Sequence, residues 1–301
     1  MAAAIFWKPI EPGRIKELCC DRPPPMMKNN WENFLKNLGE WRGSFTQISL
    51  TGEVLGSTPS ILNLEGFDNN QLVQFRLRRY SVNGYEEPPL ADYTQEYRTL
   101  GLQNIFFETG AFSKGSLQLS PVSEFGAEYG FVAGDRRLRF VQLYDPQGNL
   151  NALTLIREFR SGSHDSERPQ LTVDQLVGTW QGKAHTVYSD WSPSQRMETR
   201  LEVSVEGDRL QQTLTFGDRT LHSTAQIQGQ KLIFDEGSAI REILLLPDGA
   251  SSNTPLQVKV GRSFLVEVGW LVNPNERQRL IRSYSEKGEW ISATHVIEHR
   301  V

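Results

Sequence analysis

The strongest constraint on the fold is an internal repeat. The segment GEWRG that begins at Gly39 returns as GTWQG at Gly178. FGAEYGFV from residue 125 returns as FLVEVGWL from residue 264, and RFVQLYDPQGNLNALTLIREFR from Arg139 returns as RLIRSYSEKGEWISATHVIEHR from Arg279. The three pairs keep the same order at an offset of 139 or 140 residues. Self-similarity of this kind indicates a duplicated structural unit, so we predict two copies of one fold.

Apolar and polar residues alternate within each unit with the period of two that is typical of strands. Apolar residues at 125, 127, 129 and 131 alternate with Gly126, Glu128 and Gly130. A strand with one buried face gives this pattern, and strand and turn recur about every 8–12 residues, as in sandwiches and barrels. We therefore predict an all-β protein with two tandem antiparallel barrels. Several large side chains are candidates to point into the barrel interiors: Phe125, Tyr129, Phe131, Phe264 and Trp270.

Helical spacing is confined to a short segment before each barrel. Apolar residues between Trp31 and Leu38 predict a helix over 30–38. A shorter counterpart is expected over 172–176, with Thr172 as its N-cap. A polar segment that contains Pro169 is the predicted linker. The expected organisation is an N-terminal extension at 1–27, a first barrel at 28–160, a linker at 161–171 and a second barrel at 172–301.

Composition excludes several classes of protein. The 301 residues are 38% hydrophobic and 23% charged, which fits a globular protein with a substantial core. The net charge of −4 disfavours broad nucleic-acid binding, which needs a basic face. No apolar run approaches the roughly 20 residues of a membrane span, and the N-terminus lacks a secretory signal pattern, so we expect a cytoplasmic protein. The adjacent Cys19 and Cys20 form no disulfide framework and are expected to be inert thiols.

The sequence contains no motif that specifies a reaction. It has no Gly-x-Ser-x-Gly elbow and no phosphate-binding glycine loop. His295 and His299 lie four apart on a predicted strand, so their side chains stand about 13 Å apart and one metal ion cannot bridge them. His185 joins one of them only if its strand is adjacent. We predict a protein that is not an enzyme, without catalytic, cofactor-binding or metal-binding residues.

The repeat singles out a charged trio in each unit. Glu128, Arg139 and Glu158 in the first unit match Glu267, Arg279 and Glu298 in the second. Inside a barrel these charges would have to be paired and would be placed to orient a polar ligand. The other interpretation is a partly solvated ladder of cross-strand ion pairs. Arginine keeps a neighbouring carboxylate ionised, which argues against acid–base catalysis in either case.

Two loops of the second unit are candidates for contact with a protein partner. Tyr188, Asp190 and Trp191 fall at or near the end of a strand, before Pro193. Exposed aromatic residues in a loop are good anchors for a partner, although the same residues would also serve to cap the barrel mouth. The second candidate begins at Pro247 and Asp248, where the sequence is too apolar for a simple linker.

The segment Gly-x-Trp after a short helix resembles the opening of lipocalins and other calycins, in which the Trp plugs one barrel end. By this resemblance, Trp41 and Trp180 are barrel-end residues. A closer resemblance is to DUF3598, a family of cyanobacterial and plastid proteins of unknown function with two calycin-like barrels. It includes a plant chloroplast factor for biogenesis of ATP synthase. The segments that carry it are NWENFLKNLGEWRGSFT, GTWQGKAHTVYSDW, LLLPDGASSNTP, FLVEVGWL and QRLIRSYSEKGEW.

Two functions follow from these observations. The first is a non-enzymatic assembly factor, whose partners by resemblance would be subunits of the ATP synthase catalytic head. Two linked modules would each hold one subunit and raise the effective concentration of the other. The second is a carrier of a small apolar ligand, a lipid or tetrapyrrole, inside one barrel. Solidly packed barrels would contradict the carrier, whereas an open apolar cavity of several hundred Å³ would support it.

Overall fold

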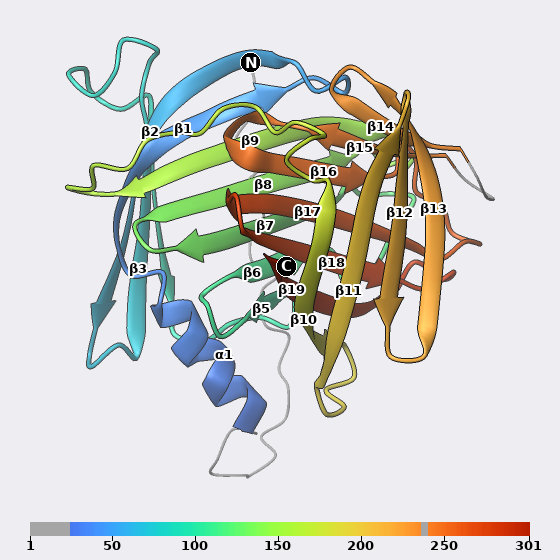
Figure 1. Cartoon of the computed structure of the whole chain (residues 1–301). Helices are drawn as coiled ribbons and strands as arrows, with labels where there is room; N and C mark the ends of the chain where they lie inside the picture. The colour runs from blue at the N-terminus through green and yellow to red at the C-terminus, as the bar shows by residue number, and fades with distance from the viewer. Residues whose placement is uncertain (1–24, 236–239) are drawn as a thin grey trace.

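The computed structural model describes residues 25–235 and 240–301. It contains two antiparallel sheets that lie side by side (Figure 1). Most of the predicted extension at 1–27, including Cys19 and Cys20, lies outside the described residues. No helix in the described part of the chain is long and apolar enough to cross a membrane.

The first unit is a helix followed by a curled sheet of nine strands. The sheet order is β4-β3-β2-β1-β9-β8-β7-β6-β5, so β4 and β5 are its free edges. The elements are α1 (Pro25–Leu35), β1 (Gly39–Ile48), β2 (Val54–Phe67), β3 (Leu72–Arg79), β4 (Ala91–Tyr97), β5 (Asn104–Phe106), β6 (Phe112–Gly115), β7 (Phe125–Ala133), β8 (Arg136–Tyr144) and β9 (Leu150–Arg160).

The second unit is a closed barrel of ten strands, β10 to β19 in chain order. A 3-10 turn, η1 (Pro247–Gly249), precedes β16. The strands are β10 (Gly178–Tyr188), β11 (Gln195–Glu206), β12 (Arg209–Phe216), β13 (Arg219–Gln228), β14 (Lys231–Phe234), β15 (Arg241–Leu245), β16 (Ala250–Thr254), β17 (Phe264–Asn273), β18 (Glu276–Tyr284) and β19 (Trp290–Arg300).

One short strand makes the difference between the open and the closed sheet. In the second unit β14 pairs with both β13 and β15, which completes the ring. The first unit passes from β4 to β5 without such a strand. There α1 covers the edge of β5 instead: the Asn30 side chain donates to the Asn104 carbonyl (2.9 Å) and accepts from the Phe106 amide (2.6 Å), and Asn33 donates to the Phe106 carbonyl (3.1 Å). Amide side chains thus replace a neighbouring strand.

The helix expected at 172–176 in the second unit is not present, and this prediction was wrong. The chain makes a turn there, in which the Leu176 amide donates to the Val173 carbonyl (2.8 Å). Gln175 accepts from the Thr172 amide (2.9 Å), so the polar start resembles a helix cap. Because β10 begins at Gly178, only one turn fits before the strand, and a single turn is too short to persist as a helix.

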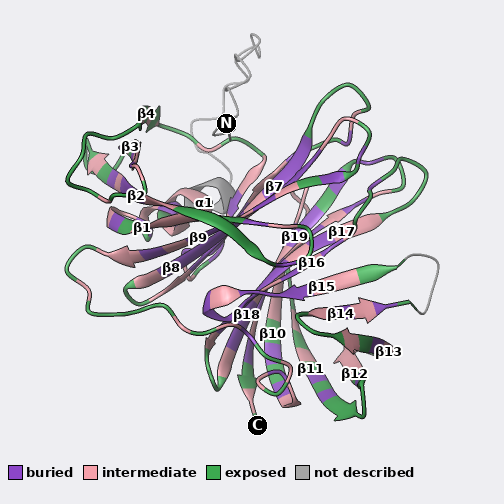
Figure 2. Cartoon of the chain, turned by 90° about the horizontal axis from the view of Figure 1, so that it is seen from above, coloured by how far each residue is buried: buried purple, intermediate pink, exposed green. Residues whose placement is uncertain are grey.

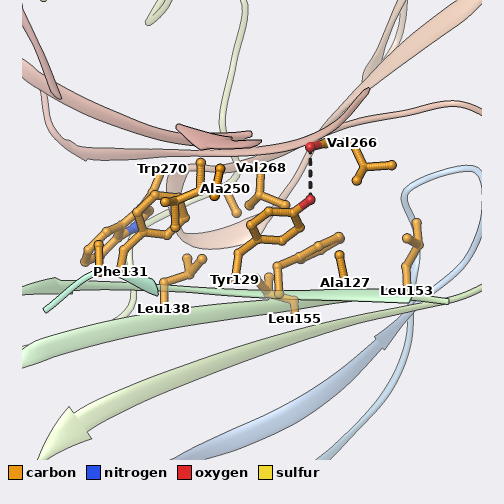
Figure 3. Packing of buried hydrophobic residues seen from close by; sticks show 14 of the residues in the cluster. Ala127, Tyr129, Phe131, Leu138, Leu153, Leu155, Ala250, Val266, Val268 and Trp270 are labelled. Atoms are coloured by element: carbon orange, nitrogen blue, oxygen red, sulfur yellow. Dashed lines mark hydrogen bonds between the residues drawn. The ribbon is translucent and has the colours of Figure 1, made fainter. Parts of the chain in front are cut away.

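The large residues of β7 and β17 do not point into the barrels, contrary to our expectation. They point outward and form one shared core between the two units, with members from β7, β8, β9, β17, β18 and β19. Figure 3 shows Tyr129 and Phe131 meeting Val266, Val268 and Trp270 across this interface, and Figure 2 shows the buried strands gathered where the units meet. The period of two establishes that one face is buried, but it does not say whether that face meets the lumen or another sheet.

This interface has approximate two-fold symmetry. The Tyr144 hydroxyl donates to the Pro255 carbonyl, and the equivalent Tyr284 hydroxyl donates to the Ser116 carbonyl, both at 2.9 Å. The backbone contacts repeat in the same way. The Leu150 amide donates to the Leu256 carbonyl (2.9 Å), and the equivalent Trp290 amide donates to the Leu117 carbonyl (2.8 Å). Two identical patches that contact each other are typical of a two-fold dimer. The duplicated units therefore pack as the two subunits of such a dimer would.

Candidate functional site

The structure brings the charged trio of the first unit together on the lumen side of β7, β8 and β9. Arg139 lies between the two carboxylates, 2.8 Å from Glu128 Oε1 and 2.9 Å from Glu158 Oε1. Arg137, which sequence reasoning missed, donates from Nε to Glu158 Oε2 (2.7 Å). The residues stand on adjacent strands, as a cross-strand ladder requires, but the Glu158 side chain is 0% exposed and therefore not solvated.

The second unit repeats this network. Arg279 Nη1 lies 3.1 Å from Glu267 Oε1, and its Nη2 lies 2.8 Å from Glu298 Oε1. Arg277 donates from Nε to Glu298 Oε2 (2.7 Å), as Arg137 does to Glu158. Extending the sequence repeat two residues upstream of Arg139 and Arg279 would have revealed this fourth member.

Electrostatics keep the two carboxylates of the first unit, Glu158 and Glu128, ionised. Burial by itself would raise the pKa of Glu158, but the guanidinium groups of Arg137 and Arg139 outweigh burial and hold the pKa at about 2. Burial would also raise the pKa of Glu128. The positive charges of Arg139 and then Lys114 outweigh this effect, so the pKa of Glu128 lies below its usual value. A carboxylate held in this way is a poor proton donor near neutral pH. The network is suited to fixing strands and to presenting charge inside the lumen.

The two predicted barrel-end tryptophans are fully buried and lie at equivalent places. The indole of Trp41 donates to the Asn37 carbonyl and that of Trp180 to the Leu176 carbonyl, both at 2.9 Å. Arg137 and Arg160 lie over the Trp41 ring at 4.8 and 4.3 Å from its centroid. Arg277 and Arg300 lie over Trp180 at 5.5 and 4.4 Å. These contacts connect each tryptophan to the charged network of its own unit.

The lumen of the first unit contains a cavity of about 80 Å³. Its walls are largely aromatic and apolar, and Glu128, Arg137, Arg139 and Lys114 lie at its polar side. A second hollow is an open groove of about 510 Å³ on the surface of the same unit. Val82 and Tyr85 line this groove, together with Asp165 and Glu167 of the inter-unit segment.

The loop that begins at Pro247 does not present Asp248 to a partner. The Asp248 carboxylate is 3% exposed, is paired with Arg136 of the first unit, and accepts a hydrogen bond from the Arg168 amide (2.8 Å). Its carbonyl accepts from the Trp270 indole (3.0 Å). The prediction of a partner contact was therefore wrong for Asp248. The loop is apolar because it packs at the junction of the two units.

The other predicted loop, at residues 188–191, is only partly exposed for contact with a partner. Asp190 is exposed, whereas Tyr188 and Trp191 are half-buried. Tyr188 donates its hydroxyl to Gln195 (2.8 Å), and Trp191 packs against the shared core. These contacts place the two aromatic side chains against their own unit and the interface.

His185 and His295 lie directly opposite each other, because β10 and β19 are neighbours. Phe107 of the first unit contacts both rings, at centroid distances of 5.7 and 5.2 Å. Burial, and then the nearby His185, lower the pKa of His295 to about 3, so this ring is neutral at physiological pH. Its Nε2 is 3.0 Å from Gln278 Oε1. Within residues 25–235 and 240–301, no group of three or more His, Cys, Asp or Glu side chains is arranged to hold a metal ion.

Comparison with known proteins identifies the family. Residues 27–163 match the N-terminal domain of DUF3598, a domain of unknown function, and residues 167–301 match the C-terminal domain of biogenesis factor required for ATP synthase 1. A DUF3598 protein of unknown function from Nostoc punctiforme is 46% identical, and the match covers 90% of this chain and 99% of that one with a TM-score of 0.84. The chain belongs to the DUF3598 family. This confirms the resemblance inferred from the sequence motifs.

The chain also has more distant similarities to other solved structures. The phycobiliprotein lyase CPES from Guillardia theta is 12% identical, and the match covers 43% of this chain and 90% of that one with a TM-score of 0.34. Transferrin-binding protein B from Haemophilus parasuis, in a mutant form, is 9% identical over 82% of this chain and 61% of that one, with a TM-score of 0.24. No match was found among curated proteins.

Proposed function

We propose that this DUF3598 protein is a non-enzymatic assembly factor that assists biogenesis of the ATP synthase catalytic head by binding its subunits in the cytoplasm or stroma. The observation that carries the proposal is the match of residues 167–301 to the C-terminal domain of an ATP synthase biogenesis factor. The fold supports it, because the paired Glu and Arg side chains inside both units favour rigid presentation of a surface over acid–base chemistry.

The packing of the two units changes how such a factor would work. The units share one hydrophobic core, and Arg136 of the first is paired with Asp248 of the second. They therefore do not act as two independently tethered modules, and effective concentration through a linker is not the mechanism we propose. A single rigid body would instead hold subunits in a fixed relative orientation.

We place the subunit contact at the open groove of the first unit. Val82 is 78% exposed and Tyr85 is 40% exposed at this groove. Exposed apolar and aromatic side chains beside a hollow of about 510 Å³ suit the anchor residues of a partner. Arg42, Arg160, Asp165 and Glu167 also line the groove and supply both signs of charge for orientation.

A pull-down from native cell extract tests this function. The full chain, tagged after the exposed Val301, is expected to retain ATP synthase catalytic-head subunits identified by mass spectrometry. Val82→Asp is expected to reduce their recovery at least tenfold, because it places a charge at the anchor position. Val122→Asp is the matched control, since Val122 is 87% exposed and does not line the groove.

The outcomes separate the parts of the proposal. Absence of any catalytic-head subunit from the wild-type eluate would contradict the assembly role. Equal recovery with both variants would retain the assembly role and reject the groove as the contact.

We favour this function over carriage of a lipid or tetrapyrrole. Pockets for ligands of that size generally have volumes of about 300–1,000 Å³. The cavity in the first lumen has about 80 Å³. The second lumen contains a packed cluster that includes Trp180, Leu201, Leu210 and Phe234.

A further inference from the structure

The lumen of the first unit differs from that of the second in ways that indicate a ligand site. Its cavity is bounded by a run of aromatic rings in which Phe34 contacts Phe106 at 5.0 Å and Tyr97 at 5.7 Å, and Phe106 contacts Phe112 at 5.1 Å. Phe75 extends the wall, 6.3 Å from Tyr97. The cavity lies beside α1, at the side where the sheet is open. Its largely apolar wall suits an apolar part of a ligand.

The polar side of the cavity carries a lysine without a partner. Lys114 on β6 is paired in register with Glu128 on β7 and with Asn104 on β5, so the three side chains share the lumen face. Lys114 has no hydrogen bond or ion pair among the described residues, whereas Glu128 is bound by Arg139 at 2.8 Å. An ammonium group beside an apolar cavity is a ready partner for an anion.

The second unit shows that the fold does not require this lysine. Asn253 occupies the position equivalent to Lys114, opposite Glu267, and donates to Glu267 Oε2 at 3.1 Å. Ile243 takes the place of Asn104. The same barrel scaffold is thus complete with a neutral asparagine, so the lysine of the first unit is a departure from the shared structure.

The two lumens also differ in charge. The network of the first unit has three cations, Lys114, Arg137 and Arg139, against the two carboxylates Glu128 and Glu158. The second has Arg277 and Arg279 against Glu267 and Glu298, which balance. In addition, Arg137 is 2% exposed and its Nη2 atom has no hydrogen-bond partner. The first lumen therefore has a net positive charge next to an apolar wall.

We propose that the first lumen binds a short-chain monocarboxylate, with its carboxylate at Lys114 and its aliphatic part between Phe106, Phe112 and Phe75. The size of the cavity sets the length of the chain. A cavity of about 150 Å³ holds a benzene ring, so about 80 Å³ suits an aliphatic chain of about four carbons. This site is independent of the groove at Val82, and its test does not depend on the assembly role.

Binding to the purified full-length protein tests the proposal by calorimetry and by saturation-transfer NMR. The ligands are the straight-chain carboxylates from acetate to octanoate, with n-butylamine and n-butanol as charge controls. Affinity is expected to rise about fourfold for each methylene up to about butyrate or valerate, and to fall for longer chains. n-Butylamine is expected not to bind. Equal binding of butanol and butyrate, or no binding of any carboxylate at millimolar concentration, would overturn the proposal and leave a cavity filled by solvent.

A matched pair of variants tests the role of Lys114. Lys114→Asn copies the residue of the second unit and is expected to weaken butyrate binding about tenfold or more, since a charge-assisted hydrogen bond is lost. Lys183→Asn makes the same chemical change at an exposed position of β10 and is expected to leave binding unchanged. Unchanged affinity in Lys114→Asn would contradict the proposal.

A second variant keeps the test decisive if Lys114→Asn fails to fold. Leu100 lines the cavity from the segment after β4 and is only half-buried, so Leu100→Phe narrows the space without changing its charge. It is expected to weaken valerate binding more than acetate binding. An equal loss for both acids would contradict the fit to chain length, and unchanged affinity for both would show that they bind outside the cavity.

Discussion

At the scale of single residues, Glu158 shows how a charge is retained inside the first unit. It is 0% exposed and accepts hydrogen bonds from both Arg137 and Arg139. Two buried cations on one carboxylate stabilise the native state only while all three are present, because the loss of one leaves uncompensated buried charge. The equivalent Glu298 shows the same arrangement with Arg277 and Arg279.

Removal of this carboxylate is expected to be costly. Glu158→Ala should lower the free energy of unfolding by about 3–5 kcal/mol, since Arg137 and Arg139 lose their main counterion. Urea denaturation at pH 7 measures the change. Asp92→Ala is the matched control: the Arg76–Asp92 pair has a shorter contact of 2.6 Å but is exposed, so its loss should cost far less than the loss of Glu158. A similar cost for both variants would contradict the importance of burial.

His295 is expected to make the stability depend on pH. Its folded-state pKa of about 3 lies below the unfolded value of about 6.5, so below pH 6.5 the unfolded state binds one proton more than the native state. The stability that neutral His295 contributes is therefore fully present above pH 6.5 and is lost as the pH falls towards 3. Between pH 7 and pH 5 this group should contribute a loss of about 2 kcal/mol.

The variant His295→Gln tests this assignment. Urea midpoints measured at pH 7, 6 and 5 should fall less steeply for the variant than for the wild type, whatever the variant's absolute stability. His222→Gln is the control, because His222 is exposed on β13 and should leave the slope unchanged. Parallel slopes for wild type and His295→Gln would contradict the buried neutral imidazole.

At the scale of elements, the two units show two solutions to the problem of a free sheet edge. An unpaired edge strand exposes backbone groups that seek partners. The second unit inserts β14 and closes the ring, whereas the first uses Asn30 and Asn33 of α1 to satisfy β5. The helix therefore has a structural role in the first unit, which is to cover the edge of β5. The second unit has no such free edge, and a turn at residues 173–176 is sufficient there.

Substitution of Asn30 tests this role of α1. Asn30→Ala removes both hydrogen bonds to β5 and is expected to destabilise the protein by about 2–3 kcal/mol. Hydrogen exchange at the Phe106 amide should become faster, because this group loses its acceptor. Asn29→Ala on the exposed side of the same helix should change neither quantity. Unaltered exchange at Phe106 would show that another group protects this strand edge.

At the scale of the whole molecule, the shared core makes the two units one cooperative structure. Trp270 is 0% exposed, and its ring lies 6.1 Å from Phe131 and 5.2 Å from the Arg136 guanidinium of the first unit. The Tyr129 hydroxyl donates to the Val266 carbonyl (2.9 Å) across the same interface (Figure 3). Heat denaturation of the wild type is therefore expected to give a single calorimetric transition.

Removal of a large side chain at this interface should destabilise both units together. Trp270→Ala is expected to lower the free energy of unfolding by about 3–5 kcal/mol through loss of packing. Hydrogen exchange should accelerate in β7 of the first unit as well as in β17. Leu221→Ala, at a 53% exposed position of β13, is the control and should have an effect below about 0.5 kcal/mol. Faster exchange in β17 alone would indicate that the units unfold independently.

The sequence by itself determined the duplication, the strand content and the family, because the repeated Gly-x-Trp segments and alternating patterns are local features. It also grouped Glu128, Arg139 and Glu158, since the repeat preserved them. Arg137 and Arg277 lay two residues upstream of the aligned segment, and the partner of Asp248 lies 112 residues away at Arg136. The repeat extended by two residues would have found the two arginines, whereas the contact between Arg136 and Asp248 leaves no trace in spacing along the chain.

Only the tertiary structure decided which face of each strand meets the lumen and which meets the other unit. A period of two gives the same pattern in both cases, because burial against a sheet and burial inside a barrel remove the same side chains from water. The structure assigned Phe125, Tyr129 and Trp270 to the interface and the charged networks to the lumens. It also decided that β14 closes one barrel while α1 covers the edge of the other, since strand closure depends on pairing between distant segments.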